Sequence, residues 1–251
     1  MYQQYLYKIL TFLSPNFYKE INDHLVNRNK LNIIDVGFYR GSFTKDLLSK
    51  LLVRNDNLDC VVYSFDPNSS VDTSGFKKFT EKNSIQWSHK YLAIGNKKSL
   101  EKFSILKKFP SSGSSINNIL IDSLWFKTRR FIVSPFTSNE NSFIEIEVDV
   151  DTLDNLFTDR DKIDLIKIDV EGYTYEVLQG AKRIIKNNNP IIQLEILSKK
   201  KDFKKKEKEI LEYLNSLGYK DFLTKKHYTT HIFSDIICCD YLFTNLENSL
   251  T

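Results

Sequence analysis

Two acidic side chains that stand close together in the sequence are the strongest candidates for chemistry. Asp169 and Glu171 occur in the run KIDVEGY, directly after a short apolar stretch that is typical of a buried strand. A carboxylate is costly to bury unless it is paired or used. At the floor of a cleft, such a pair can hold an ammonium group, orient a hydroxyl or act as a general base. A salt bridge or a helix N-cap would explain the same residues without catalysis.

A glycine loop after the first apolar run indicates where a ligand would lie. The segment 35–41 reads DVGFYRG and leads into a helical pattern. Glycines let the backbone pass close to a ligand, and the N-terminus of a helix offers unpaired N–H groups. The spacing is neither the GxGxxG of a dinucleotide site nor the GK[ST] of a phosphate loop, which argues against NAD and ATP. A tight turn without a ligand would look the same.

The next two apolar runs end in residues that suit an adenosine. Asp66, followed by Pro67, stands about 30 residues after the glycine loop, where a carboxylate can accept both hydroxyls of a ribose. Ala93 and Ile94 precede a glycine and offer a small apolar ledge for a flat ring. Three successive strand ends therefore favour one adenosine-containing ligand without a pyrophosphate cradle, and S-adenosylmethionine (SAM) is the obvious candidate.

Apolar runs alternate with helical patterns along most of the chain. Strands are predicted at 32–36, 61–65, 91–94, 165–169 and 191–196, with two more within 222–243. Helices are predicted at 1–28, 42–53, 76–81, 173–186 and 205–217. Continuous apolar strands separated by helices indicate a parallel sheet covered on both faces, that is, a doubly wound α/β fold.

The length of 251 residues fits one α/β domain with two additions. We predict a single domain over 1–251, with a helical segment at 1–30 and an insertion at 97–150. The insertion is rich in Ser and Asn and then alternates as FIEIEVD, so we expect a hairpin and a loop over the sheet edge. Long loops are usually functional, and we expect 111–118 to contact the acceptor.

Composition excludes several classes of protein. Hydrophobic residues make up 41% and charged residues 27%, which excludes a largely disordered chain. A formal charge of +4 is too small to argue for nucleic acid. Cys60, Cys238 and Cys239 lack disulfide or zinc spacing, and we expect buried, reduced thiols and a cytoplasmic location. No segment approaches the ~20 apolar residues of a membrane span, and the aromatic-rich start leaves room for a peripheral membrane contact.

Several short runs, in their order along the chain, resemble the FkbM-type methyltransferases. The similarity covers about residues 30–197 and rests on DVGFYRG at 35–41, SFDP at 64–67, LAIG at 92–95, VDTLD at 150–154, IDLIKIDVEG at 163–172 and EVLQGA at 176–181. The KIDVEG run with a following LxGA is specific to that family. The glycine loop is common to all SAM-dependent methyltransferases.

The resemblance implies a Rossmann-like class I methyltransferase fold, with a mostly parallel seven-stranded sheet, helices on both faces, an antiparallel last strand and an inserted hairpin. It implies SAM as the cofactor and O-methylation of a hydroxyl on a sugar, glycan or related small metabolite. The implied cofactor-binding residues are Asp35, Gly37, Phe38, Tyr39, Gly41, Asp66, Pro67, Ala93 and Ile94. Asp169 and Glu171 would lie near the transferred methyl group as base or orienting group, with His89 as an alternative base.

One departure from the family and two other classes of function stay open. Phe38-Tyr39 stands where the family commonly has Ala-Asn, and a bulkier loop would narrow the cofactor pocket, as in a non-catalytic binding module. A metal-dependent enzyme would draw on oxygens such as those of Glu195, but no ligand spacing is diagnostic and we assign no metal. The lysines at 199–201 and 204–206 suggest RNA, DNA, an acidic glycan or a membrane surface. Acidic residues share the following helix, which favours a solvated face.

Overall fold

The structure is a computed structural model that describes residues 16–106, 116, 143–226 and 235–244. Its central sheet has the order β3-β2-β1-β7-β8-β10-β9. The strands are β1 (Lys30–Val36), β2 (Asp59–Phe65), β3 (Gln86–Lys90), β7 (Leu165–Ile168), β8 (Ile191–Lys199), β9 (Phe222–Lys226) and β10 (Ile236–Phe243). β10 pairs antiparallel with β8 and β9, while the pairs from β3 through β8 are parallel. The prediction of a mostly parallel seven-stranded sheet is confirmed.

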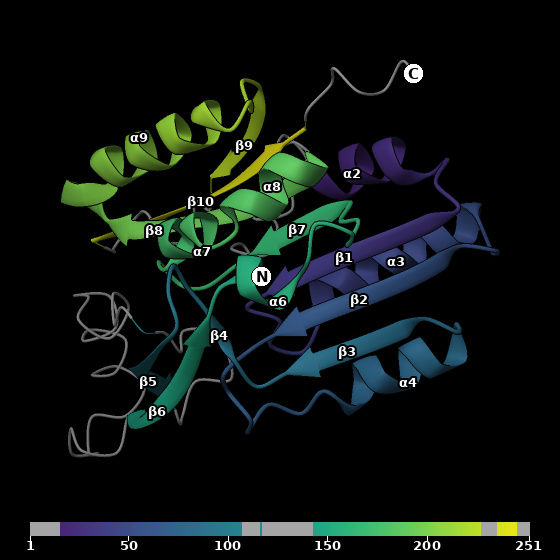
Figure 1. Ribbon diagram of the computed structural model, residues 1–251, viewed down its shortest axis with the longest axis horizontal. Coiled ribbons are helices and arrows are strands. Elements are labelled where there is room, and N and C mark those ends of the chain that lie inside the picture. The colour runs from purple at the N-terminus through teal and green to yellow at the C-terminus, as the bar shows by residue number, and fades with distance from the viewer. Residues whose placement is uncertain (1–15, 107–115, 117–142, 227–234, 245–251) are drawn as a thin grey trace, which may run out of the picture.

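Helices cover both faces of this sheet (Figure 1). They are α2 (Phe17–Leu25), α3 (Ser42–Arg54), α4 (Ser74–Lys82), α6 (Leu153–Leu156), α7 (Thr174–Gln179), α8 (Lys182–Asn188) and α9 (Lys200–Ser216). Successive side chains of a strand point to opposite faces. In β1, Leu31 and Ile33 therefore pack with α2, α3 and α4, whereas Ile34 and Val36 pack with α6, α7, α8 and α9. The central strands therefore lie between two apolar layers, one on each face of the sheet.

The third strand of the central sheet lies before the position that the sequence predicted. The predicted segment 91–94 contributes only β4 (Ala93–Ile94), which belongs to a second sheet, and the strand beside β2 is β3. β3 reads QWSHK and alternates between exposed and half-buried positions, as an edge strand does. It contains no continuous apolar run, so an apolar-run criterion cannot find it.

The second sheet has the order β4-β6-β5 and contains the expected hairpin. β5 (Ser99–Leu106) pairs antiparallel with β6 (Phe143–Asp151). This hairpin lies beside the arrowheads of the central strands, at the lower left of Figure 1. The predicted acceptor loop at 111–118 lies outside the described residues except for Ile116. The hairpin therefore lies beside the carboxyl ends of the parallel strands.

The predicted helices differ in their bounds from those of the structure, most of all the ones predicted at 1–28, 173–186 and 205–217. α2 begins at Phe17, and residues 1–15 lie outside the described part. The helix predicted at 173–186 is broken into α7 and α8, and α9 begins at Lys200 rather than at 205. The break falls at Gly180, where an added Cβ would lie 1.9 Å from the backbone oxygen of Gly95. Two chain segments cross there, backbone against backbone.

In the described part of the chain, no helix combines the length and apolar character needed to cross a membrane. The three cysteines are free and buried, as predicted.

Candidate active site

The sheet order places its switch point between β1 and β7. From β1 the chain continues outward through β2 and β3, while β7 and β8 extend the sheet on the other side. Ligands of open α/β sheets bind beyond the carboxyl ends of the strands at such a point. The residues that directly follow β1 and β7 are Gly37 and Asp169, so the glycine loop and the first of the two candidate acids are neighbours in space.

Gly37 allows the two strand ends to approach each other. It has a φ of +77°, and an added Cβ would lie 1.8 Å from the backbone oxygen of Asp169. The N–H of Asp169 donates to Val36 O over 2.9 Å, and the N–H of Gly37 donates to Phe65 O over 2.9 Å. The position therefore requires glycine both for its backbone conformation and for space.

Gly37→Ala is expected to lower the free energy of unfolding by about 2–5 kcal/mol, because a strained φ and a backbone clash add together. Urea unfolding of the two proteins measures the difference. Gly75→Ala is the matched control, since no atom lies within 4 Å of the Cβ that it adds in α4. That variant should be as stable as the original chain or slightly more stable. Equal stability of both variants would contradict the assignment of Gly37 as an obligatory glycine.

A buried lysine that the sequence analysis did not single out connects the two strand ends. The Nζ of Lys167 donates to Gly37 O over 2.7 Å and lies 3.1 Å from an oxygen of Asp35 and 3.5 Å from one of Asp169. Its side chain is 6% exposed. Burial alone would lower the pKa of Lys167, but the carboxylates of Asp35 and Asp169 outweigh it and raise the pKa. The ammonium group therefore stays charged at the centre of the site.

Asp35, near the end of β1, is held by contacts with Thr44 and Lys167. Its carboxylate is fully enclosed and accepts a hydrogen bond of 2.5 Å from the hydroxyl of Thr44 in addition to the ion pair with Lys167. Oδ2 is therefore hydrogen-bonded to Thr44, and Oδ1 is held by charge, 3.1 Å from the Lys167 ammonium. A direct contact between Asp35 and SAM stays a prediction, and the geometry gives Asp35 the task of holding Lys167.

The bulky side chain of Phe38 does not narrow the loop. It is 2% exposed and lies in the core, with ring centroids 4.9 Å from Phe76, 5.8 Å from Trp87 and 5.4 Å from His89. The expectation of a pocket narrowed by Phe38 is wrong, because the ring fills an apolar layer beneath the loop. Gly41 makes room for it, since a Cβ there would lie 2.3 Å from the ring.

Asp66 ties the end of β2 to the glycine loop. One oxygen accepts the N–H of Tyr39 over 2.7 Å, and the other accepts the N–H of Asn68 over 2.9 Å. Burial raises the pKa of Asp66, while these two N–H groups act to lower it. Each carboxylate oxygen keeps a further lone pair. The side chain is thus fixed in direction and retains the capacity to accept ribose hydroxyls, the role that was predicted for it.

Asp66→Asn is expected to raise the Kd for SAM about 10- to 100-fold, since hydrogen bonds to a charged group contribute about 1.5–3 kcal/mol. An amide also cannot accept from Tyr39 and Asn68 with both of its ends. Calorimetric titration with SAM provides the measurement. Asp56→Asn is the control, because Asp56 is exposed in the turn before β2, at the end of that strand away from Asp66, and accepts from neighbouring Asn57. An unchanged Kd for Asp66→Asn would refute the role of Asp66.

The remaining predicted cofactor residues lie around this centre. Tyr39 has a φ of +49° and is half-buried, with the Arg40 guanidinium 5.2 Å from its ring centre. Pro67 is half-buried directly after Asp66. Ala93 and Ile94 are 5% and 2% exposed and pack into apolar clusters, so little of their side-chain surface is available to a ligand. Their contact with an adenine ring stays a prediction.

The two candidate acids differ in their surroundings. Asp169 is 39% exposed and held by Lys167, whereas Glu171 is buried and has a φ of +50°. Glu195 on β8 is within electrostatic range of both. Burial raises the pKa of Glu195, and the charges of Asp169 and Glu171 raise it further. The negative charges of the two predicted acids therefore also act on a third carboxyl group.

His89 is engaged away from these acids. Trp87 Nε1 donates to Ser64 Oγ over 2.8 Å, and Ser64 Oγ lies 2.8 Å from His89 Nδ1. The Ser64 hydroxyl can donate to His89 Nδ1 or accept from it, depending on the imidazole tautomer. Burial lowers the pKa of His89, which favours the neutral imidazole. β2 and β1 separate His89 from β7, so a role as alternative base is disfavoured.

Within the described ranges, no group of three or more His, Cys, Asp or Glu side chains is placed to hold a metal ion.

Several of the motif residues form a scaffold. The N–H of Asp154 donates to Gly180 O over 2.9 Å, and its carboxylate accepts the N–H groups of Arg183 and Ile184 over 2.8 and 3.0 Å. Gly180 in turn crosses Gly95. The runs around 95, 154 and 180 thus meet at one point beside the site and hold β4 against the start of α8.

The sheet order, the glycine loop at the switch point and the acid that follows β2 define a Rossmann-like methyltransferase. Residues 35–220 match the family model described as the methyltransferase FkbM domain, and the chain belongs to this family. The family is SAM-dependent, so the cofactor is SAM. The residues present fit SAM. Positive φ values at 37, 39 and 41 turn the loop tightly, and Asp66 faces that loop with unused lone pairs.

Comparison with solved structures gives distant matches. A methyltransferase FkbM from Methylobacillus flagellatus KT is 15% identical, with a TM-score of 0.48 over 85% of this chain and 44% of that one. M. jannaschii TYW2 in complex with AdoMet is 12% identical, with a TM-score of 0.42 over 93% and 78% of the two chains. The O-methyltransferase TomG from Streptomyces achromogenes, in complex with SAM, is 9% identical, with a TM-score of 0.40 over 92% and 81%. The chain thus spans less than half of the first of these. No curated protein matches the chain.

Proposed function

We propose that the chain transfers a methyl group from SAM to a hydroxyl of a sugar, glycan or related small metabolite. The observation that carries the proposal is the exposed carboxylate of Asp169, held 3.5 Å from the buried ammonium of Lys167 at the switch point of the sheet. A carboxylate in that place adjoins the glycine loop and remains open to an acceptor. Family membership supports methyl transfer, and the choice of a hydroxyl rests on Asp169.

The residues divide the work of the reaction. When bound, SAM would supply a methyl group activated by its positively charged sulfur, and the sulfur–methyl bond that breaks would leave a neutral thioether. The loop 37–41 and Asp66 would hold SAM. Asp169 takes the proton that the acceptor hydroxyl loses, and Glu171 orients the acceptor. Lys167 fixes the direction of the Asp169 carboxylate, so the base needs no reorganisation when the acceptor arrives.

The surface lysines of α9 support a glycan or small metabolite over a nucleic acid. Lys204, Lys205 and Lys208 each pair with a glutamate three or four residues further along the same helix. Such pairs neutralise much of the charge that nucleic-acid backbones require. We also place the reaction in the cytoplasm, because the three free, buried thiols fit a reducing compartment.

Incubation of the protein with methyl-labelled SAM and a panel of glycans, nucleotide sugars, small alcohols and RNA tests the proposal. We expect the label on a hydroxyl of a sugar or small molecule, as a methyl ether that stays on the sugar when the glycan is hydrolysed. Label on RNA would contradict the proposed acceptor class while leaving methyl transfer intact. No label transfer together with no calorimetric binding of SAM would overturn the enzymatic function altogether.

A further inference from the structure

One lysine of α9 lies on the buried side of the helix. Lys206 is half-buried, whereas the other lysines of the helix, at 200, 201, 204, 205 and 208, are exposed. Three positions before it and four after it, Phe203 and Ile210 are buried in the core. This spacing puts all three on one face. An ammonium group on an apolar face loses hydration, so it requires a specific partner there.

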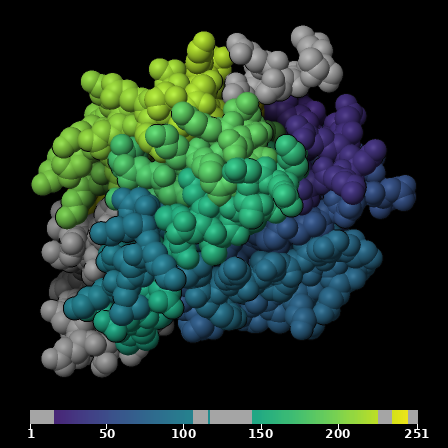
Figure 2. Space-filling model, in the orientation of Figure 1, coloured from purple at the N-terminus to yellow at the C-terminus, as the bar shows by residue number. Residues whose placement is uncertain are grey.

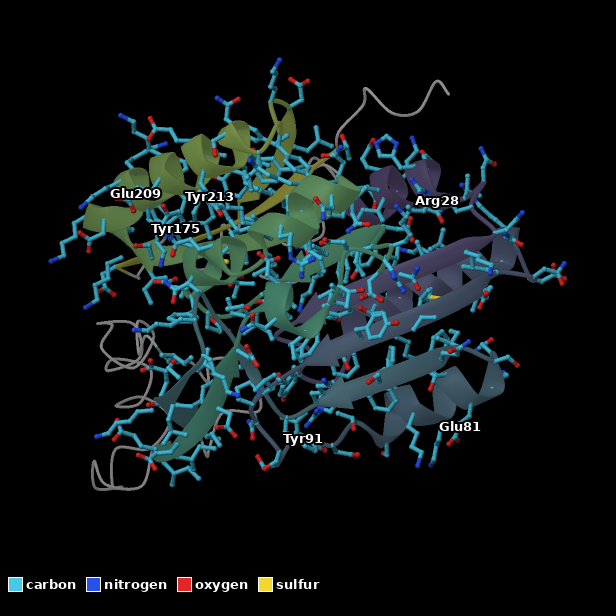
Figure 3. The ribbon with its side chains drawn as sticks, in the orientation of Figure 1. Arg28, Glu81, Tyr91, Tyr175, Glu209 and Tyr213 are labelled. Atoms are coloured by element: carbon cyan, nitrogen blue, oxygen red, sulfur yellow. The ribbon has the colours of Figure 1, made fainter. Side chains whose placement is uncertain are left out.

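α9 contacts α7 through Tyr213, two turns after Lys206. The rings of Tyr175 and Tyr213 meet edge to face with centroids 5.6 Å apart (Figure 3), and the Tyr213 hydroxyl donates to Leu178 O over 3.4 Å. The outer face of α9 forms the upper left surface in Figure 2. The helix thus presents charged side chains to solvent and its inner face to the residues that follow β7.

The partner of Lys206 is the turn that carries a candidate acid. Its Nζ donates a hydrogen bond to Gly172 O. Glu171 and Gly172 have φ values of +50° and +99°, two successive left-handed residues. Such a conformation is costly at Glu171, because its side chain is attached to a Cβ, and it persists only where neighbours enforce it. The bond from Lys206 is one such restraint.

Two glutamates act on the ammonium group at longer range. Burial lowers the pKa of Lys206, and the charges of Glu176 and Glu209 act to raise it. Glu176 lies two residues after Thr174, where α7 begins, and among the described residues its buried Oε2 has no hydrogen-bond partner. The direct contact that joins Lys206 to the site is therefore its hydrogen bond to the turn.

We propose that Lys206 is a positioning residue, which holds the Glu171–Gly172 turn and thereby aims the carboxylates of Asp169 and Glu171 at the acceptor. This inference rests on the proposed function. It gives one member of the lysine-rich segment a task in the reaction, whereas its neighbours pair on the surface. The side chain of Lys206 contacts a backbone oxygen of the turn, so it would act on the two carboxylates through the backbone.

Lys206→Met keeps the apolar stem of the side chain and removes its donor, and Lys205→Met is the matched control on the exposed face. With methyl-labelled SAM and the acceptor preparation of the function test, we expect Lys206→Met to lower kcat about 10- to 100-fold, because small misplacements of reacting groups cost up to that much. The Kd for SAM should stay unchanged, and Lys205→Met should match the original chain. Lys206→Arg, which retains a donor, should recover most of the rate.

Combining Lys206→Met with Glu171→Gln distinguishes a positioning role of Lys206 from a general loss of stability. The effects of Lys206→Met and Glu171→Gln on kcat should be clearly less than additive, since both act on one turn. Full kcat in Lys206→Met, or additive effects together with a weaker Kd for SAM, would overturn the inference.

Backbone hydrogen exchange at 170–174, measured with SAM present, tests the restraint without any acceptor. Exchange should be faster in Lys206→Met than in Lys205→Met, and equal exchange would overturn the inference. If the original chain transfers no label, the proposed function fails, while this comparison still decides whether Lys206 holds the turn.

Discussion

Asp169→Asn is expected to abolish methyl transfer while binding of SAM survives. Asparagine keeps the size of the side chain but cannot accept the proton of the hydroxyl, and general-base catalysis typically contributes about 10²- to 10⁴-fold. The side chain is 39% exposed, so the fold tolerates the change. Lys167 keeps its contacts with Asp35 and Gly37 O, which preserves the loop. Initial rates of label transfer and calorimetry with SAM measure the two effects separately.

Asp59→Asn is a suitable control for this prediction. Asp59 is exposed at the amino end of β2, whereas the glycine loop lies at the carboxyl ends of the strands. Its carboxylate is 3.8 Å from the ammonium group of Lys30. Its loss should leave both the rate and the Kd unchanged. A normal rate in Asp169→Asn would show that Asp169 is not the base, whatever the result for SAM binding.

Lys167→Met is expected to reduce the free energy of unfolding by about 3–5 kcal/mol, the usual cost of breaking a buried ion pair on one side. The change leaves the enclosed Asp35 without its counter-charge and Gly37 O without its donor. Urea unfolding gives the free energy, and the Kd for SAM should rise at the same time because the loop loses its anchor. The loss of stability and the rise in Kd are both expected, because the same ammonium group neutralises Asp35 and holds the glycine loop.

A double variant shows whether the unpaired charge causes the loss. Lys167→Met combined with Asp35→Leu removes both members of the pair, and replacing a whole buried pair with apolar groups is often close to neutral. We expect the double variant to recover much of the stability that Lys167→Met loses. A double variant less stable than Lys167→Met would show that packing around Asp35 and Thr44, rather than charge, dominates the site.

The sequence predicted those parts of the fold that rest on continuous apolar segments. β1, β2, β7 and β8 are buried on both faces, so each reads as an apolar run and its position followed directly. β3 was not predicted, because it is an edge strand that is solvated on one side. Its sequence, QWSHK, therefore contains no apolar run. The helix at 173–186 was predicted as continuous, whereas its break involves residues distant in sequence: Gly180 approaches Gly95, and Asp154 accepts the N–H groups at the start of α8.

The candidate site shows the same division between local and long-range information. The glycine loop, Asp66 and the KIDVEG run each follow a strand, and the structure brings Gly37, Tyr39, Asp66 and Asp169 together. Lys167 was missed although a lysine in the centre of the apolar strand LIKI was a usable signal. Lys206 belongs to a run of similar residues, and only the packing of α9 distinguishes it.

The crossing of Gly95 and Gly180 has a mechanical consequence for the two sheets. It lies directly after β4, where Ala93 pairs with Val150, and at the break between α7 and α8. A Cβ at Gly180 would lie 1.9 Å from Gly95 O, so any side chain there must push the two backbones apart. A change at this one position is therefore transmitted to the helices of the central sheet and to the second sheet together.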